Sequence, residues 1–473
     1  MLQNRRKFLQ NIALGSLGLS VSPDIFADKK NNLLSRNFSK ESNQTFNMCG
    51  YQAPKIDKVR VAFIGVGSRG TSNLRQMTYL EGVEIKSICD INPEAIDRVQ
   101  KLLVKQFLPK AKIYTGSEES WKKACEDPNI DLISIAVPRG PLHAAISIYA
   151  MEHGKHVAVE VPAIFTIEEA WNLVETSERT RRHCMMMENC CYDFFELLTL
   201  NMARQGFFGE IVHGDAAYIH SSGQKGLVSG KERIWSLTEK QRYNGNLYPT
   251  HGLGPICQAM NVNRGDKLTY MVSMSSADFM RGNAVHEMAE KDPYYKKFDS
   301  ATYCGNMNTS IIRTEKGRTI MLQYDVTSPR VYSRIHMLSG TKGACLKYPL
   351  PARISIDERW LNDTEMDEIK EKFTQASVKR IGEMARKVGG HGGMDFLMTW
   401  RLIDCLRNGL PMDQDVYDAA LWSVIWPLSE WSVANKSKPI DIPDFTRGAW
   451  KTNEPVDVSL SKGGNTVIRE RLL

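Results

Sequence analysis

The sequence lacks the features that define several common classes of protein. Its lysines and arginines exceed its acidic residues by a net charge of +7. They are scattered, so no long basic tract or basic-aromatic stripe points to a nucleic-acid partner. Its 10 cysteines show neither paired metal-ligand spacing nor a disulfide framework, and most lie in apolar runs, where a thiol behaves as a small hydrophobic group. We therefore predict free thiols, no metal site and no nucleic-acid partner.

Long apolar runs are equally scarce. The apolar stretch at 12–21 is too short to span a bilayer, and no later stretch could do so. This stretch follows the basic string NRRKFLQ and precedes IFA, which ends at Ala27, an order typical of an export signal with a small-residue cleavage site. The pair Arg5-Arg6 resembles a twin-arginine signal, whereas an ordinary signal peptide with a chance arginine pair is the alternative. We expect residues 1–27 to direct the protein to the periplasm or beyond.

The length of the chain predicts two domains. Its 473 residues are too many for one compact core, and 42% hydrophobic and 24% charged residues are typical of a globular protein. Residues 28–56 are polar and aperiodic, which predicts a linker without regular structure. Because the sequence pattern changes near residue 190, we expect one domain over 57–190 and a second over 191–473.

A glycine-rich turn opens the first domain. The apolar, β-branched run 59–64 predicts a strand, and Gly65, Gly67 and Gly70 follow it with the spacing G-x-G-x-x-G before a helical stretch. The first glycine permits the tight turn, the second lets a pyrophosphate approach the backbone, and the third allows close packing of helix on strand. We expect Gly65, Gly67, Ser68, Arg69 and Gly70 to contact a dinucleotide at the N-terminus of this helix.

An acidic residue closes the second predicted strand. Asp90 ends the run VEIKSICD, twenty residues after Gly70. A carboxylate at this place hydrogen-bonds the ribose hydroxyls of the adenosine and repels a 2′-phosphate. Ile91 and Asn92 follow, with no arginine among them to receive that phosphate. NAD is therefore favoured over NADP, and a glycine-rich turn in some other α/β protein is the alternative.

Further strands and helices then alternate along the chain. Apolar strands are predicted at 130–138, 155–162 and 183–188, with helical stretches between them, as in a βαβ array with a parallel sheet. The cofactor lies at the carboxyl ends of the strands in such a sheet. We therefore expect five residues that follow these strands to contact it: Gly140, His143, Glu160, Val161 and Asn189.

The second half of the chain predicts a different architecture. Alternating runs surround the turns at 315–317 and 340–343, which indicates hairpins of a mostly antiparallel open sheet. Helices are expected near 364–387, 394–408 and 413–434. The three tryptophans of the last helix, Trp422, Trp426 and Trp431, are expected to fill a core or an interface. The predicted fold class is α/β, with an N-terminal Rossmann domain and a C-terminal α+β domain.

From about residue 57 onward the chain resembles the Gfo/Idh/MocA oxidoreductases. Dehydrogenases of that superfamily usually carry Glu-Lys-Pro after the fifth strand, where the lysine assists proton transfer. This chain has Glu160-Val161-Pro162, and a valine cannot move a proton. The strings HVAVEVPA, MMENCCYDFFEL, GEIVHGDAAYIH, NGNLYPTHGLGP, TSPRVYSRI and GGHGGMD instead resemble glycoside hydrolase family 109, the NAD-dependent α-N-acetylgalactosaminidases.

This resemblance implies a glycosidase mechanism that does not use a pair of flanking carboxylates. The sugar is oxidised at C3 with NAD⁺ as the acceptor, and the resulting ketone acidifies the proton on C2. Loss of that proton expels the group on C1, water adds, and reduction at C3 restores the sugar and the cofactor. Such a route needs proton-transfer groups beside C3, C2 and the leaving oxygen, which a histidine can supply near neutral pH.

The resemblance also implies which residues serve the sugar. His251 is the expected proton-transfer residue, with Tyr192 and Glu160 as further catalytic candidates. Contacts with a glycan substrate are expected from the residues Tyr218, Tyr248, Pro249, Thr250, His251 and Tyr332. Where the family usually has an arginine after Trp235, this chain has Ser236, for which Arg233 or Arg242 could compensate.

Two other functions stay open at this point. An exported NAD(P)-dependent sugar oxidoreductase with a tightly held cofactor is the first alternative, and a non-catalytic glycan-binding protein is the second. His391 could line the site or cap the helix that starts near Met394. The resemblance further implies that two chains could pair through their sheets as a homodimer.

Overall fold

The structure is a computed structural model that describes residues 44–221, 223–231 and 234–469. The predicted export signal at 1–27 and the first part of the predicted linker lie outside the described residues. Within the described ranges, no helix is both long enough and apolar enough to cross a membrane.

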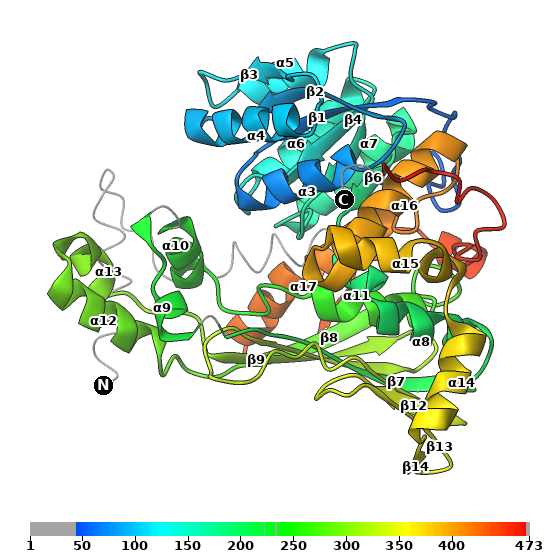
Figure 1. Cartoon of the computed structure of the whole chain (residues 1–473). Helices are drawn as coiled ribbons and strands as arrows, with labels where there is room; N and C mark the ends of the chain where they lie inside the picture. Colours follow the sequence, from blue (N-terminus) through cyan, green and yellow to red (C-terminus); the bar gives the residue numbers. More distant parts are fainter. Residues whose placement is uncertain (1–43, 222, 232–233, 470–473) are drawn as a thin grey trace. The chain divides into compact units, whose positions relative to one another are not determined.

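The first domain is a six-stranded parallel sheet with helices on its faces (Figure 1). Its strands are rich in buried β-branched and apolar residues, as expected for strands covered on both faces. The strands are β1 (Val59–Ile64), β2 (Val83–Cys89), β3 (Lys112–Tyr114), β4 (Leu132–Ile135), β5 (His156–Val159) and β6 (Cys184–Met186). The helices are α3 (Ser68–Thr78), α4 (Pro93–Lys105), α5 (Ser120–Glu126), α6 (Leu142–Glu152) and α7 (Ile167–Thr180).

The strand order of this sheet places the cofactor site. The order is β3-β2-β1-β4-β5-β6, and every neighbouring pair is parallel. The direction of winding therefore reverses between β1 and β4, and open α/β sheets bind ligands in the crevice outside the carboxyl ends at such a point. The turns after β1, β4, β5 and β6 all meet at this edge, which confirms the predicted Rossmann fold.

The second domain contains a nine-stranded, mostly antiparallel sheet with the order β14-β13-β12-β11-β7-β10-β9-β8-β15. Only β10 and β7 pair in parallel among its described strands. Both predicted hairpins are confirmed, since β9 turns into β10 and β11 turns into β12. The strands are β7 (Ile211–Ile219), β8 (Leu268–Ser275), β9 (Met307–Thr314), β10 (Thr319–Asp325), β11 (Met337–Gly340), β12 (Gly343–Leu346), β13 (Arg353–Ile356), β14 (Arg359–Trp360) and β15 (Ile440–Asp441).

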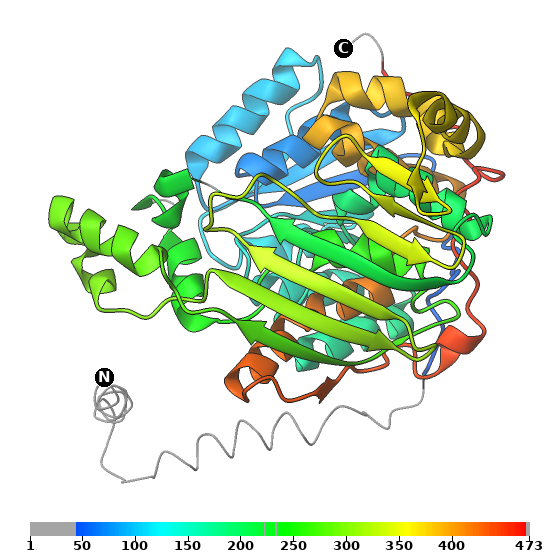
Figure 2. The same ribbon diagram turned by 90° about the horizontal axis from the view of Figure 1, so that it is seen from below.

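Helices cover one face of this sheet, while Figure 2 looks onto its other face. The larger helices are α8 (Phe194–Arg204), α10 (Ile234–Arg242), α11 (Thr250–Ala259), α12 (Arg281–Lys291), α14 (Asp363–Phe373), α15 (Ala376–Val388), α16 (Met394–Asn408) and α17 (Val416–Ala434). Short helices are η1 (Asn189–Tyr192), α9 (Gly223–Leu227), η3 (Pro293–Tyr295), α13 (Lys296–Asp299), η4 (His391–Gly393) and η5 (Ala449–Lys451). The helix predicted over 364–387 is two helices, because Thr374 and Gln375 have extended backbone.

The long helix α17 contacts both domains. It packs against α7 of the Rossmann domain and against β8 of the large sheet. Trp422 and Trp426 are each 1% exposed, which confirms that they fill a core. Because both domains contribute to this packing, the helix fixes the Rossmann edge beside the second domain.

The described half of the predicted linker is packed rather than detached. Residues 44–56 form no helix or strand, yet Met48 is buried and its backbone N–H donates to the hydroxyl of Tyr417 at 3.1 Å. Asn47 donates to Asn453 at 2.7 Å, and Ile56 donates to the backbone carbonyl of Leu406. The polar composition of this stretch concealed these contacts, because its partners are at least 350 residues away.

Candidate active site

The glycine-rich turn has the geometry of a dinucleotide site. Gly65 has φ of +83°, and a Cβ there would lie 2.6 Å from the carbonyl oxygen of Ala136. A Cβ on Gly70 would lie 1.9 Å from the carbonyl oxygen of Gly65, whereas a Cβ on Gly67 would meet open space. Gly67 precedes α3 without a side-chain cap, so the first-turn N–H groups are available to an anion. The turn therefore fits a pyrophosphate against the start of α3.

Asp90 is oriented toward this turn by backbone donors. Its carboxylate accepts hydrogen bonds from the N–H of Val66 at 2.7 Å and from the N–H of Asn92 at 2.8 Å. Arg98 of α4 reaches the same turn, and its Nη2 donates to the carbonyl oxygen of Val66 at 3.2 Å. The sequence argument against a phosphate-binding arginine considered only the residues next to Asp90, and α4 brings one in from outside that range.

We expect Asp90→Ala to lower the affinity for NAD by about 10- to 100-fold, because charge-assisted hydrogen bonds to the ribose are lost. The same variant should gain affinity for NADP, since Arg98 then faces a 2′-phosphate without a competing carboxylate. Isothermal titration of cofactor-stripped protein measures both effects. Asp90→Ala combined with Arg98→Ala should lose the gain for NADP, and Glu84→Gln on the same strand should bind NAD as the wild type does. Unchanged NAD binding by Asp90→Ala would contradict this role.

A charged network lies behind the turn. Nε of Arg69 donates to Glu160 at 2.6 Å, and Nη1 of Arg69 donates to Asp395 at 2.6 Å. Asn73 also donates to Glu160, at 2.8 Å, and the amide of Asn189 donates to Asp395. Three residues predicted for the cofactor from the turns after β1, β5 and β6 are thus brought together, and Asp395 of α16 joins them.

His391 belongs to the same network. Its Nδ1 donates to Asp395 at 2.8 Å, and this hydrogen bond raises the pKa of His391. Burial would raise the pKa of Asp395, but the hydrogen bond from His391 and the charge of Arg69 hold it well below its usual range. A Cβ on Gly390 would lie 2.6 Å from Nε2 of Gln76, which explains the glycine beside His391. The His391 side chain is 62% exposed, so it faces solvent rather than the core.

His143 and Val161 lie beneath this network. His143 is buried, with Nδ1 2.8 Å from the carbonyl oxygen of Pro162 and Nε2 3.0 Å from that of Val137. Through these two contacts the His143 ring supports the turns after β4 and β5. Burial lowers the pKa of His143. Val161 is 5% exposed and offers no proton-transfer group where the resembling dehydrogenases carry a lysine.

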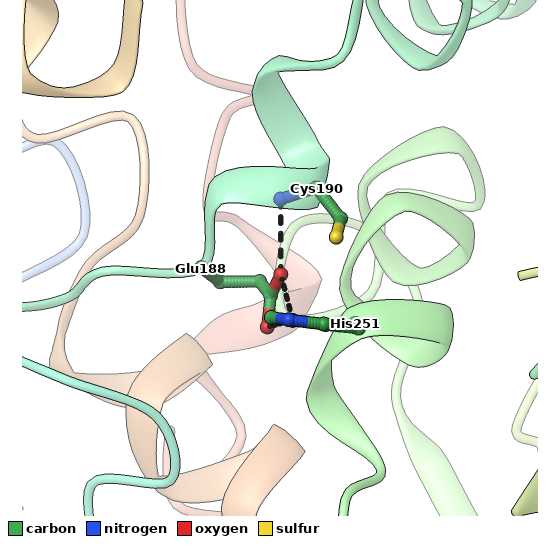
Figure 3. A group of neighbouring side chains, drawn as sticks. All are labelled: Glu188, Cys190 and His251. Carbon is green, nitrogen blue, oxygen red and sulfur yellow. Dashed lines mark hydrogen bonds and ion pairs between the residues drawn. The ribbon is translucent and has the colours of Figure 1, made fainter. Parts of the chain in front are cut away.

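The second half of the site centres on His251 in the first turn of α11 (Figure 3). Its Nδ1 lies 2.7 Å and 2.8 Å from the two carboxylate oxygens of Glu188, which follows β6. The N–H of Cys190 donates to the same carboxylate at 3.0 Å. The Glu188 side chain is 0% exposed and the His251 side chain is 13% exposed. The pair therefore joins a buried carboxylate to a ring that reaches the surface of the site.

Aromatic side chains surround His251. The ring of Tyr248 lies 4.7 Å from it and that of Tyr218 5.3 Å from it, both edge to face. Tyr218 and Tyr248 stack on each other at 4.5 Å, and the Tyr218 hydroxyl lies 3.0 Å from Nδ1 of His220. Burial raises the pKa of both tyrosines, so their phenols stay neutral and act as hydrogen-bonding groups rather than bases.

Tyr332 continues this wall from the segment after β10. Its ring meets that of His220 at 5.3 Å, and its hydroxyl accepts a hydrogen bond from Arg334 at 2.8 Å. Burial lowers the pKa of His220, and the charges of His251 and His391 lower it further. His220 thus connects the His251 side of the site with the His391 side. The structure brings Tyr218, Tyr248, His251 and Tyr332 together as the sequence predicted.

Comparisons with known proteins identify relatives of both domains. The model of the glycosyl hydrolase 109 C-terminal domain matches residues 192–452, and that of the oxidoreductase family with an NAD-binding Rossmann fold matches residues 59–188. A protein of Shewanella oneidensis named alpha-N-acetylgalactosaminidase is 44% identical over 455 residues, 95% of this chain and 94% of the relative. A glycosyl hydrolase family 109 protein of Shewanella pealeana is 43% identical over 466 residues, 97% and 99% of the two chains.

This chain belongs to glycosyl hydrolase family 109. Among solved structures, levoglucosan dehydrogenase in complex with NADH aligns with a TM-score of 0.61 at 16% identity, covering 82% of this chain and 100% of that chain. A scyllo-inositol dehydrogenase from Lactobacillus casei aligns with a TM-score of 0.58 at 11% identity, covering 82% and 100%. At such identities the likeness shows the fold alone. The predicted family, the NAD-binding Rossmann domain and the overall fold are confirmed.

One expected site residue of this family 109 protein lies elsewhere. Tyr192 ends the single turn η1, is 3% exposed, and donates from its hydroxyl to Asp413 at 3.2 Å. Asp413 in turn accepts two hydrogen bonds from Arg401. Because η1 turns Tyr192 into this buried cluster, the structure does not bring it to His251. Pro249 and Thr250, which precede His251, are buried at the start of α11.

A cation that the sequence did not suggest lies beside Trp235, the chain neighbour of Ser236. Arg242 is exposed at the end of α10, and Arg233 lies outside the described residues. The guanidinium of Arg139, from the turn after β4, lies 5.7 Å from the ring of Trp235 and 5.2 Å from that of Tyr248. It also forms an ion pair with Glu239 at 2.7 Å. Arg139 thus supplies a positive charge beside Trp235 from the Rossmann domain.

The spacing of Glu188, Cys190 and His251 would also allow a metal ion, because one ligand atom of each lies within 4.8 Å of the others. Nδ1 of His251 nevertheless lies at hydrogen-bonding distance from both carboxylate oxygens, which leaves no room for a cation between them. Burial raises the pKa of Cys190 well above its usual value, so its thiol is a poor ligand. The arrangement is that of a hydrogen-bonded acid–histidine pair.

Glu188, Asp395 and Arg139 are the functional candidates that the sequence did not single out. Glu188 follows a Rossmann strand directly, and Asp395 lies four residues after His391, so both had a local signal. Their partners come from distant segments, however, since His251 is 63 residues from Glu188 and Asn189 is 206 residues from Asp395. All ten cysteines are free, as predicted.

Proposed function

We propose that this family 109 protein cleaves terminal α-N-acetylgalactosaminides, or a related α-glycoside, with an NAD cofactor that is restored in each turnover. The named relative from Shewanella oneidensis supports this choice of glycan. A glycan or glycoconjugate is therefore the proposed substrate, while the homodimer stays a prediction.

The observation that carries the proposal is the position of the His251–Glu188 pair. It meets the carboxyl ends of the Rossmann strands, where the reactive end of a dinucleotide lies in this fold. Val161 replaces the lysine on which a simple alcohol dehydrogenase of this fold would depend. The site thus keeps the cofactor cradle and a histidine, and it lacks the usual group for net dehydrogenation.

Each proton step can be assigned to side chains of this chain. When NAD is bound, it supplies the acceptor and donor for oxidation and reduction at C3 of the sugar. His251 takes a proton from the sugar through Nε2, where it exchanges with water, and gives up a proton later in the cycle. The neutral phenols of Tyr218, Tyr248 and Tyr332 hold sugar hydroxyls by hydrogen bonds. Glu160, held by Arg69 and Asn73, accepts a hydrogen bond from the sugar or from the ribose of the cofactor.

Incubation with 4-nitrophenyl α-N-acetylgalactosaminide, without added NAD, tests this function. We expect release of nitrophenol and, in D₂O, deuterium at C2 of the released sugar, because the C2 proton is removed and replaced. Cleavage without deuterium would contradict the elimination route. No cleavage with or without NAD⁺, together with an absorbance change at 340 nm on adding free sugar, would favour the sugar oxidoreductase. Cleavage of only another nitrophenyl sugar would change the proposed glycan but not the proposed reaction.

We also propose that residues 1–27 are a twin-arginine-type signal and that the protein is exported with its cofactor bound. A recycled cofactor suits a compartment without a pool of NAD, because none is consumed. The sequence at 4–27 supports this proposal, and these residues lie outside the described ranges. Exported protein that contains no NAD and stays inactive until NAD⁺ is added would contradict it.

A further inference from the structure

Glu188 combines full burial with a single charged partner. Its side chain is 0% exposed, and its carboxylate accepts hydrogen bonds from Nδ1 of His251 and from the N–H of Cys190. Burial would raise the pKa of Glu188, yet the charge and hydrogen bond of His251 leave it below its usual value. The carboxylate therefore stays ionised at neutral pH, although a buried carboxylate without a partner would take up a proton.

This ionised carboxylate determines the state of the His251 ring. An ionised carboxylate only accepts hydrogen bonds, so Nδ1 of His251 carries the proton that lies between them. In the neutral ring Nε2 is then the basic nitrogen, and it makes no hydrogen bond within the described residues. The edge-to-face contacts with Tyr218 and Tyr248 restrict rotation of the ring. The ring is thus held in one tautomer and one orientation.

A purely structural pair would look different. His156 and His183, which stack in the Rossmann core, are 3% and 4% exposed, and burial lowers the pKa of both. The His251 side chain is 13% exposed, and it lies beside the tyrosine wall of the site. The Glu188 end of the pair is buried, whereas the His251 ring is partly exposed. This arrangement suits a base that binds Glu188 through one nitrogen and receives a proton on the other.

We propose that Glu188 is a positioning residue for the reaction: it fixes His251 with the proton on Nδ1 and stabilises the imidazolium that forms when Nε2 accepts a proton from the sugar. The proton moves from the sugar to Nε2 and exchanges there with water, Glu188 stays ionised throughout, and Nε2 gives up a proton later in the cycle. This inference rests on the proposed function for its kinetic part, while the tautomer of His251 is a property of the protein alone.

The groups that face His251 set what can be tested by pH. Glu188 and Cys190 approach it from the segment after β6, Tyr248 from the segment before α11, Tyr218 from β7, and His220 from the residue after β7. Of these, only Glu188 carries a negative charge at neutral pH, because burial keeps Cys190 and both tyrosines protonated. Removing the Glu188 charge therefore removes the one group that favours the imidazolium.

Glu188→Gln and Glu188→Asp provide the test in the full-length protein with its cofactor. We expect Glu188→Gln to lower kcat for the nitrophenyl glycoside by roughly 10²- to 10⁴-fold, with KM changed less than about threefold. The acidic limb of kcat/KM should move to lower pH in Glu188→Gln, and Glu188→Asp should restore the wild-type limb and part of kcat. Glu169→Gln, at the capping box of α7, is the control and should keep the wild-type rate and profile.

Nitrogen-15 spectra of histidine-labelled protein give a measurement that needs no activity. The His251 resonances, assigned by their loss in His251→Asn, should show the proton on Nδ1 in the wild type and not exclusively there in Glu188→Gln. A wild-type rate and pH profile in Glu188→Gln, or an Nε2–H tautomer in the wild type, would overturn the inference. If the wild type cleaves no glycoside, the proposed function fails, and the spectra still decide whether Glu188 sets the tautomer. A Glu188→Gln protein that unfolds would leave Glu188→Asp and the wild-type spectrum to decide.

Discussion

His251→Asn should lower kcat for glycoside cleavage by roughly 10³-fold, while the protein keeps its bound cofactor. The side-chain amide of asparagine can replace Nδ1 as the donor to Glu188, so the buried carboxylate keeps a partner. No group remains in the place of Nε2 to accept the proton of the sugar. Steady-state kinetics with the nitrophenyl glycoside and the NAD released on denaturation measure the two effects separately.

His251→Ala is the informative comparison for this variant. It also removes the base, but it leaves Glu188 buried without the partner that now lowers its pKa. Since that pKa is depressed in the folded wild type, the carboxylate stabilises the fold above about pH 4.5 and loses this effect as the pH falls. We expect His251→Ala to be about 1–3 kcal/mol less stable at neutral pH than His251→Asn, and equally inactive. A rate within tenfold of the wild type in His251→Asn would exclude His251 as the base.

The parts of this site that the sequence predicted are those encoded by short segments. The turn from Gly65 to Gly70 was predicted from the glycine spacing and the strand before it, and a Cβ on Gly65 or Gly70 would lie only 2.6 Å or 1.9 Å from a backbone oxygen. The tyrosine–histidine string at 248–251 was expected from its resemblance to a family, and its residues do meet around one ring. The strands were predictable because a buried parallel sheet requires continuous apolar runs.

The parts that the sequence missed depend on contacts between distant segments. Asp395 lies in the first turn of α16, yet its carboxylate accepts a hydrogen bond from Arg69, which lies in the first turn of α3 in the Rossmann domain. Asn189 was expected at the site from its place after a strand and Tyr192 from the family resemblance, but the turn η1 directs their side chains to different partners. No local pattern reports which way a single helical turn faces. For the same reason the sequence did not identify Arg139, because this residue reaches Trp235 only after the two domains have packed together.

Asp395 should be the most sensitive position of the charged network. Its carboxylate is 1% exposed and accepts hydrogen bonds from Arg69, Asn189 and His391. Asp395→Ala leaves a partly buried guanidinium with Glu160 as its remaining carboxylate, and it leaves the amide of Asn189 without its acceptor. We expect a loss of about 3–5 kcal/mol in the free energy of unfolding, as for other broken buried ion pairs. Denaturant titration of the cofactor-free protein measures this loss directly.

The same substitution should weaken cofactor binding, because Arg69 and Asn189 belong to the turns at the cofactor edge and lose the group that orients them. Asp395→Asn keeps one acceptor oxygen and should lie between Asp395→Ala and the wild type in both stability and NAD affinity. Asp367→Ala is the matched control, since Asp367 pairs with Lys370 on the surface of α14 with 75% of its side chain exposed, and it should change stability by less than about 0.5 kcal/mol. If Asp395→Ala were as stable as this control, Arg69 and Asn189 would have found other partners, and the network would not join α16 to the cofactor turn.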